Sequence, residues 1–172
     1  MLEKLVNQVF LAIGSNLGNK KHNIEKVKHL LEESENFKIK KTSSYYKTKS
    51  WPDPSKPSYY NIVIETETSL DPLNLFYFLK KIERKLGRKY SSKNSPRECD
   101  IDILDYNQKC FNIIYDKSNS IIIPHPRMHQ RNFVLIPLFE ISKKWIHPKF
   151  KKKIYHLIKQ IDPIELRSIT VE

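Results

Sequence analysis

The chain has 172 residues, of which 39% are hydrophobic and 11% aromatic, and its formal net charge at pH 7 is +12. This length is sufficient for one domain with a substantial apolar core, and we expect residues 1–172 to form a single domain. No apolar run approaches the roughly 18 residues of a membrane helix, and the first residues lack a signal-peptide core, so we expect a cytoplasmic protein without a membrane span.

The charge and the cysteines narrow the functional class only slightly. A positive surface suits nucleic acid or an anionic small substrate such as a nucleotide. The two cysteines, Cys99 and Cys110, lack the spacing of a metal site, which is typical of a reduced protein. We expect Cys99 to be a small buried side chain rather than a reactive thiol.

The first half of the chain predicts a strand, a helix and two further strands. The evidence is a short apolar run, then helical spacing, then two segments rich in β-forming residues. These elements are expected at 8–13, 20–35, 37–47 and 59–67. We interpret the Gly- and Asn-rich segment 14–19 as a structural turn, and the segment 49–57, which contains three prolines, as a loop.

The second half begins with a helix over 72–86, capped by Ser69 or Asp71 and ended by Gly87. A basic loop, 88–95, leads into the strand that begins at Asp100, and Arg97 at its edge is a planar cation suited to phosphate. Later segments predict a strand that pairs as a hairpin, another short strand, a helix interrupted by Pro137, and an amphipathic patch. Their expected ranges are 111–115, 121–124, 133–141 and 154–161.

This order, β-α-β-β-α-β followed by extra elements, predicts an α+β, ferredoxin-like fold. In such a fold an antiparallel sheet carries helices on its faces, with the two helices of the repeat on one face. We expect the remaining C-terminal residues to add a hairpin and helices.

The strand after the basic loop carries two carboxylates, Asp100 and Asp102. Side chains at i and i+2 of a strand share a face, and their Cα atoms lie roughly 6.6 Å apart. Two carboxylates in this arrangement can hold one hard cation or a close pair. We expect Ile101, Ile103 and Leu104 to anchor the strand from the other side. By itself, the pattern is also compatible with a solvated edge strand.

Four stretches in this order resemble the 6-hydroxymethyl-7,8-dihydropterin pyrophosphokinase family of the folate pathway. They are AIGSNLG at 12–18, PSYYN at 57–61, PRECDIDIL at 96–104, and IPHPRMHQRNF at 123–133 with PLFE at 137–140. The resemblance covers nearly the whole chain, from about residue 9 to residue 141. It implies an ATP-dependent enzyme that transfers a pyrophosphoryl group to the hydroxymethyl group of the pterin and releases AMP.

The resemblance also implies a role for each matching residue. Two Mg²⁺ ions would bind Asp100 and Asp102, which form the catalytic set together with Arg88 and Arg97. The residues that match ATP contacts are Glu83, Arg88, Arg97, Ile103, His125 and Arg131. The residues that match pterin contacts are Thr48, Trp51, Tyr59, Asn61 and Phe133. Among them, Tyr59 and Phe133 match the two rings that sandwich the pterin, and Asn61 matches the side chain that hydrogen-bonds to its edge.

Some of these residues have plain structural alternatives. Glu83 could be a surface glutamate paired with a lysine, Tyr59 and Phe133 could be core side chains, and the basic residues from Lys143 onward could form a solvated face. We expect small-molecule substrates and neither nucleic acid nor a membrane as partners. Other folate-pathway enzymes are possible partners.

The chain departs from the family pattern in the loop before the metal strand. Ser95 replaces a usual glycine, Asn94 lies where a tryptophan is often found, and the loop 88–95 is slightly short. These departures leave open a catalytically weakened relative that acts as a partner of another folate enzyme. An RNA-binding module with the same β-α-β-β-α-β plan is a further alternative, but it would carry an aromatic RNP1-type strand where this chain has Asp-Ile-Asp-Ile.

Overall fold

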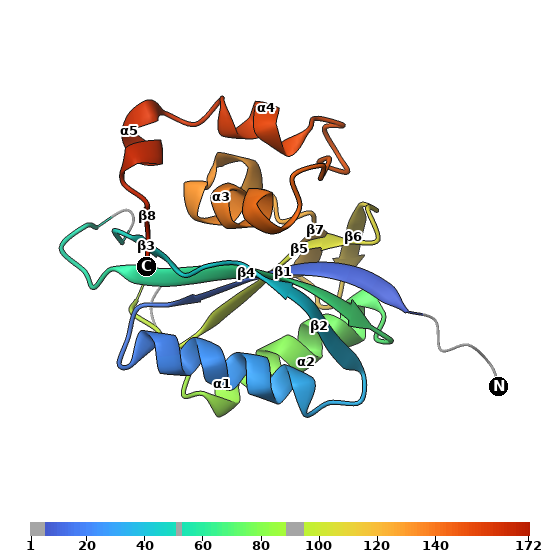
Figure 1. Cartoon of the computed structure of the whole chain (residues 1–172). Coiled ribbons are helices and arrows are strands. Elements are labelled where there is room, and N and C mark those ends of the chain that lie inside the picture. Colours follow the sequence, from blue (N-terminus) through green and yellow to red (C-terminus); the bar gives the residue numbers. More distant parts are fainter. Residues whose placement is uncertain (1–5, 51–52, 89–94) are drawn as a thin grey trace.

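The structure is a computed structural model that describes residues 6–50, 53–88 and 95–172, and an antiparallel sheet lies at its centre (Figure 1). The strands are β1 Asn7–Ser15, β2 Phe37–Thr42, β3 Tyr46–Thr48, β4 Tyr59–Thr68, β5 Asp100–Tyr106, β6 Phe111–Ile114, β7 Ser120–Ile123 and β8 Thr170–Val171. Six of them form one sheet in the order β5-β1-β4-β3-β8, with β2 also paired to β4, whereas β6 and β7 form a separate hairpin. The predicted antiparallel sheet and the predicted hairpin are therefore confirmed.

Helices cover both faces of this sheet (Figure 1). They are α1 Lys20–Glu32, α2 Pro72–Lys85, α3 Asn132–Ile141, α4 Ile154–Ile158 and α5 Pro163–Arg167, with a short 3-10 helix, η1, at Met128–Gln130. The predicted start of α2 is confirmed, because the Asp71 side chain accepts hydrogen bonds from the backbone N–H groups of Leu73 and Asn74. Within the described residues, none of these helices is both long and apolar enough to span a bilayer.

The two faces of the sheet bury two separate apolar cores. Val9, Leu11 and Ile13 of β1 belong to the core that includes buried residues of α1 and α2, whereas Phe10 belongs to the core that includes buried residues of α3. Successive side chains of a strand alternate between faces, so Gly14 lies on the same face as Phe10. This α3-side face carries the residues of the candidate site.

The prediction of one long strand over 37–47 is wrong, because the chain leaves the strand geometry between Thr42 and Tyr46. Ser43 is buried, and its hydroxyl accepts a hydrogen bond from the backbone N–H of Val63 at 3.0 Å. The backbone N–H of Ser44 donates to Glu140 of α3 at 3.0 Å. These side-chain bonds replace part of the regular ladder and divide the segment into β2 and β3.

The expectation that Leu104 anchors the strand opposite the aspartates is also wrong. Ile101 and Ile103 lie in the core beside α1 and α2, as predicted, but Leu104 lies in the core beside α3. The register shifts at this point, since Leu11 pairs with Ile103 whereas Phe10 pairs with Asp105. Leu104 is therefore the extra residue of a β-bulge.

The C-terminal third differs from prediction in three respects. Pro137 does not interrupt α3, which runs from Asn132 to Ile141 with the proline inside it. The amphipathic patch 154–161 forms a helix only over Ile154–Ile158. The strand β8, which pairs with β3, was not predicted.

Candidate active site

Three neighbouring strands place their site residues in one row. Gly14 of β1 pairs with Asn61 of β4 on one side and with Asp100 of β5 on the other. Directly opposed residues share a face, and two strand spacings amount to about 10 Å. The Asn61 amide donates to the Thr48 hydroxyl at 3.0 Å, so two of the residues predicted to bind pterin are in contact.

Gly14 is needed because the Asn61 side chain lies directly over it. A methyl group at this position would be 2.9 Å from Asn61 Oδ1 and 3.6 Å from a ring carbon of Tyr59. The glycine therefore lets the amide of Asn61 and the ring of Tyr59 approach the sheet backbone closely.

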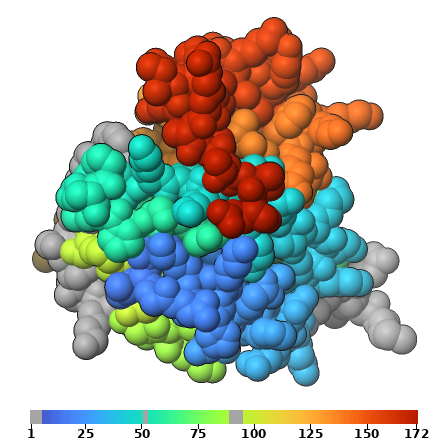
Figure 2. Space-filling view, turned by 60° about the vertical axis from the view of Figure 1, so that its left-hand side comes forward, coloured from blue at the N-terminus to red at the C-terminus, as the bar shows by residue number. Residues whose placement is uncertain are grey.

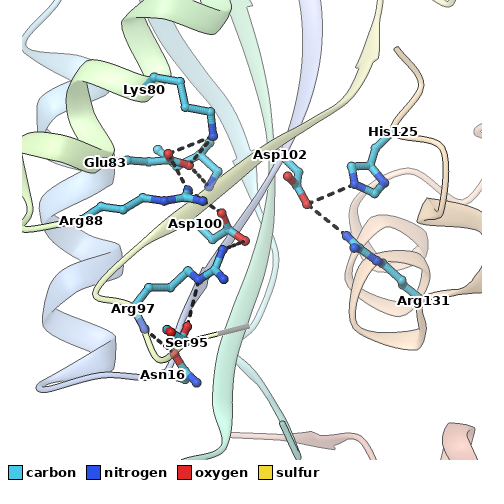
Figure 3. A network of polar contacts seen from close by, with 11 residues as sticks. Asn16, Lys80, Glu83, Arg88, Ser95, Arg97, Asp100, Asp102, His125 and Arg131 are labelled. Carbon is cyan, nitrogen blue, oxygen red and sulfur yellow. Dashed lines mark hydrogen bonds and ion pairs between the residues drawn. The ribbon is translucent and has the colours of Figure 1, made fainter. Parts of the chain in front are cut away.

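Asp100 lies between two arginines, Arg88 and Arg97 (Figure 3). Its carboxylate accepts from Arg88 at 2.6 Å and from Arg97 at 3.3 Å. Burial alone would raise the pKa of Asp100, but the guanidinium groups of Arg97 and Arg88 outweigh this effect and lower the pKa. The carboxylate is therefore ionised at neutral pH and available to a cation.

Asp102 faces an arginine and a histidine, which come from the segment leading into α3 (Figure 3). Arg131 donates to its carboxylate at 3.1 Å, and Nε2 of His125 lies 3.8 Å from it. Burial lowers the pKa of His125; Asp102 opposes this shift and Arg131 adds to it. The imidazole is therefore mostly neutral at pH 7. The Arg131 guanidinium also lies 5.5 Å from the centre of the Phe133 ring.

Glu83 is not the surface residue that its structural alternative assumed. Its side chain is 1% exposed and forms ion pairs with Lys80 at 2.9 Å and with Arg88 at 2.5 Å. The same carboxylate accepts from the backbone N–H of Ile101 at 2.8 Å. Glu83 therefore satisfies a backbone group of β5 and fixes Arg88 beside Asp100.

Sequence reasoning overlooked Asn16 as a residue that organises the site. Of the segment 14–19 that was predicted as a turn, Gly14 and Ser15 lie in β1 and residues 16–19 connect it to α1. Asn16 in this connection is 1% exposed. Its Oδ1 accepts from the Arg97 backbone N–H at 2.8 Å, and its amide donates to the Pro57 carbonyl at 3.3 Å. Asn16 thus connects the segment that carries Arg97 to the one that enters β4. The only sequence signal was a polar residue in a glycine-rich turn.

The remaining predicted residues differ in how the structure places them. Tyr59 and Phe133 are both half-buried. The Ile103 side chain is 8% exposed and lies in the core beside α1 and α2, so only its backbone can reach a ligand. Cys99 is 1% exposed, which confirms it as a buried side chain. Trp51, which we expected to contact the pterin, lies outside the described residues.

The departures noted in the loop before β5 are described only in part. Ser95 is not among the non-glycine residues with positive φ in the described segments, so replacing the glycine introduces no left-handed strain there. Asn94 and most of the loop lie outside the described residues.

The chemistry of the aspartate pair fits Mg²⁺. Carboxylate oxygens are its preferred protein ligands, and the Asp100 and Asp102 side chains remain 32% and 28% exposed. Among the described residues, no group of three or more acidic, histidine or cysteine side chains could hold a metal by itself. A cation here would therefore complete its coordination with oxygens of water or of a bound substrate, as is usual for magnesium in phosphoryl-transfer sites.

The site is defined by side-chain chemistry, and the aspartates lie outside two hollows of the described surface. One hollow of about 290 Å³ is lined by His129, Gln130, Gln160, Ile161, Asp162 and Glu165. Another of about 210 Å³ is lined by residues of α1 and α2 and of the turn after α1. Neither is lined by Asp100, Asp102 or the residues that pair with them, which are Arg88, Arg97, His125 and Arg131.

Comparison with known proteins identifies relatives over most of the chain. A 2-amino-4-hydroxy-6-hydroxymethyldihydropteridine pyrophosphokinase from Aquifex aeolicus is 36% identical over 146 residues, which cover 85% of this chain and 87% of that protein. The folic acid synthesis protein of Pneumocystis carinii is 36% identical over 177 residues, but this chain spans only 22% of its length.

Solved structures show the same fold. A Plasmodium falciparum HPPK-DHPS variant solved with pterin and p-hydrobenzoate matches with a TM-score of 0.77 and 16% identity, over 99% of this chain and 48% of that one. An HPPK-DHPS chain solved in complex with substrates matches with a TM-score of 0.70, over 90% of this chain and 43% of that one. The chain thus spans less than half the length of these two solved proteins.

A family model matches residues 10–143, which include Asp100, Asp102 and the residues that pair with them. The chain therefore belongs to the 7,8-dihydro-6-hydroxymethylpterin-pyrophosphokinase family.

Proposed function

We propose that this chain transfers a pyrophosphoryl group from ATP to the hydroxymethyl group of 6-hydroxymethyl-7,8-dihydropterin, giving the pterin diphosphate and AMP in folate biosynthesis. The row of Asn61, Gly14 and Asp100 carries this proposal. In this row the Asn61 side chain, which can hydrogen-bond to the edge of a heterocycle, lies two strand spacings, or about 10 Å, from Asp100. The Asp100 carboxylate suits a metal–phosphate complex.

At the phosphate end, Asp100 and Asp102 would hold two magnesium ions together with oxygens of ATP. When bound, magnesium neutralises phosphate charge and lowers the pKa of the pterin hydroxyl group. Arg88, Arg97 and Arg131 neutralise the two carboxylates in this structure. Once cations take over that role, the same guanidinium groups can turn to phosphate oxygens, for which their planar geometry is suited.

At the pterin end, the rings of Tyr59 and Phe133 are the proposed stacking partners, and the contact between Asn61 and Thr48 orients the amide that reads the pterin edge. Stacking of this kind contributes about 0.5–1.5 kcal/mol beyond burial. We also propose that His125, Arg131 and Glu83 contact ATP and that Trp51 contacts the pterin.

Phe133→Ala is expected to raise the Kd for pterin by about tenfold, because stacking and ring burial are lost together. The Kd for ATP should stay within about twofold, because Arg131 and Asp102 remain in place. Titration of the variant with each ligand measures both constants. Phe139→Ala, on the same helix, is a suitable control for loss of an aromatic ring. An unchanged pterin Kd would make Phe133 a packing residue only.

Gly14→Ala is expected to raise the pterin Kd by about tenfold, since the new methyl group would displace the Asn61 amide, which lies 2.9 Å from that position. A smaller effect on ATP is expected. Equilibrium binding of both ligands, with a thermal melting curve of the same sample, separates local displacement from unfolding. Normal pterin affinity together with normal stability would contradict the role of Asn61.

The reaction itself is tested by measuring nucleotide products from ATP and Mg²⁺ with and without 6-hydroxymethyl-7,8-dihydropterin. Pterin-dependent AMP without ADP is the expected result. Pterin binding without AMP formation would instead support the catalytically weakened relative. If the chain neither bound pterin nor formed AMP, the proposed function would be wrong.

The same proposal covers the organisation of the chain. We propose that residues 1–172 act as one ferredoxin-like pyrophosphokinase domain, since a single sheet contributes to both cores and its order is β5-β1-β4-β3-β8. A cytoplasmic location is supported by ATP as co-substrate and by the free cysteines Cys99 and Cys110. Other folate-pathway enzymes are proposed partners, because relatives include a bifunctional folate synthesis protein.

A further inference from the structure

Residues 163–172 form α5 and β8, and we call this segment the C-terminal strap. It follows the part of the chain that matches the family model, which ends at residue 143. Figure 2 shows the strap in red, running from the C-terminal helical layer onto the edge of the sheet. No side chain of the strap is buried, although Leu166 packs partly against the core beside α3.

The strap is attached at one end to the first turn of α3. Asn132 is 7% exposed, and its amide donates to the backbone carbonyl of Glu165 at 2.6 Å and to the Ser168 hydroxyl at 3.4 Å. The Oδ1 atom of the same side chain accepts from the backbone N–H of Phe133 at 2.6 Å. Asn132 therefore joins the strap directly to the residue proposed as one pterin-stacking ring.

The other end of the strap is attached to the strand that leads to Thr48. Thr170 pairs with Lys47, and Val171 pairs with Tyr46, so β8 extends the sheet beyond β3. The backbone N–H of Glu172 donates to the Tyr45 carbonyl at 2.9 Å. Thr48 immediately follows this paired segment and receives the hydrogen bond from Asn61.

We infer that the C-terminal strap is a positioning element for the pterin, because it connects the Phe133 side of the proposed site to the Thr48 side. This inference rests on the proposed function. The short connection between Ser168 and Thr170 limits how far α3 and β3 can separate, which preorganises the side chains on both. Because the strap contributes no buried side chain, its removal should affect ligand geometry more than folding.

The test removes residues 163–172 by ending the chain at Asp162. We expect the pterin Kd and KM to rise about tenfold, while kcat and the Kd for a non-hydrolysable ATP analogue with Mg²⁺ stay within about twofold. A second variant that lacks only 170–172 keeps the Asn132 contacts and should raise the pterin Kd by about threefold. This variant also preserves the test if the larger deletion does not fold. Ile164→Ser is the matched control, because Ile164 is 78% exposed, and it should change nothing.

An unchanged pterin Kd in both deletions would overturn the inference. It would also be overturned if pterin and nucleotide binding weakened equally with a lower melting temperature, since that result would indicate a general structural role. The undeleted 172-residue chain separates this inference from the proposed function. If it forms AMP with pterin and the deletions bind pterin normally, only the strap inference fails. Both fail if the undeleted chain binds no pterin.

Discussion

Asp100→Asn and Asp102→Asn are each expected to lower kcat by about 10²–10³-fold, equivalent to about 3–4 kcal/mol of transition-state stabilisation. Asparagine preserves the size of the side chain but removes the charge that binds a cation. The pterin Kd should remain within about twofold, because Asn61, Thr48 and Phe133 are unchanged. Steady-state AMP formation and pterin titration on the same preparation measure both quantities.

The arginines make a control necessary for this comparison. Without the Asp100 charge, Arg88 and Arg97 lose their shared partner, so each variant also requires a melting curve. Asp116→Asn, in the exposed turn between β6 and β7, should keep full activity. Normal turnover in the Asp100 and Asp102 variants would exclude the metal role. A loss of pterin affinity equal to the loss of kcat would indicate general damage to the site.

Glu83→Ala is expected to lower the free energy of unfolding by about 2–4 kcal/mol, because it removes a buried anion that forms two ion pairs and accepts a backbone hydrogen bond. Lys80 and Arg88 would lose their ion pairs, and the backbone N–H of Ile101 would lose its acceptor. Glu83→Gln keeps an acceptor for that N–H group and should cost less, about 1–3 kcal/mol. Urea-induced unfolding of the wild type and both variants measures these differences.

The Glu83 series also separates the two roles considered for this residue. Glu32→Ala, at the exposed end of α1, is the control and should change stability by no more than about 0.5 kcal/mol. If Glu83→Gln left stability unchanged but raised the KM for ATP, Glu83 would be a nucleotide contact. Loss of stability with an unchanged KM would identify it as the residue that supports β5 and Arg88.

The sequence by itself determined the features that depend on local periodicity and on short motifs. The apolar run in β1 and the Asp-Ile-Asp-Ile segment identified two buried strands, and Asp71 with Pro72 identified the start of α2. The placement of Asp100 and Asp102 on one face also followed from their spacing, and they pair with Gly14 and Ala12 of β1. These features were predictable because neighbouring residues largely specify a strand face, a helix cap or a charged loop.

The tertiary structure alone decided the features that depend on partners distant in the chain. The bulge at Leu104 exists because β5 pairs out of step with β1, and no residue within β5 shows this by itself. The burial of Glu83 requires α2 to end beside β5, and the role of Asn16 requires three loops to meet. The pairing of β8 with β3 joins residues more than 120 positions apart. Such contacts are set by the packing of whole elements, which local sequence periodicity does not record.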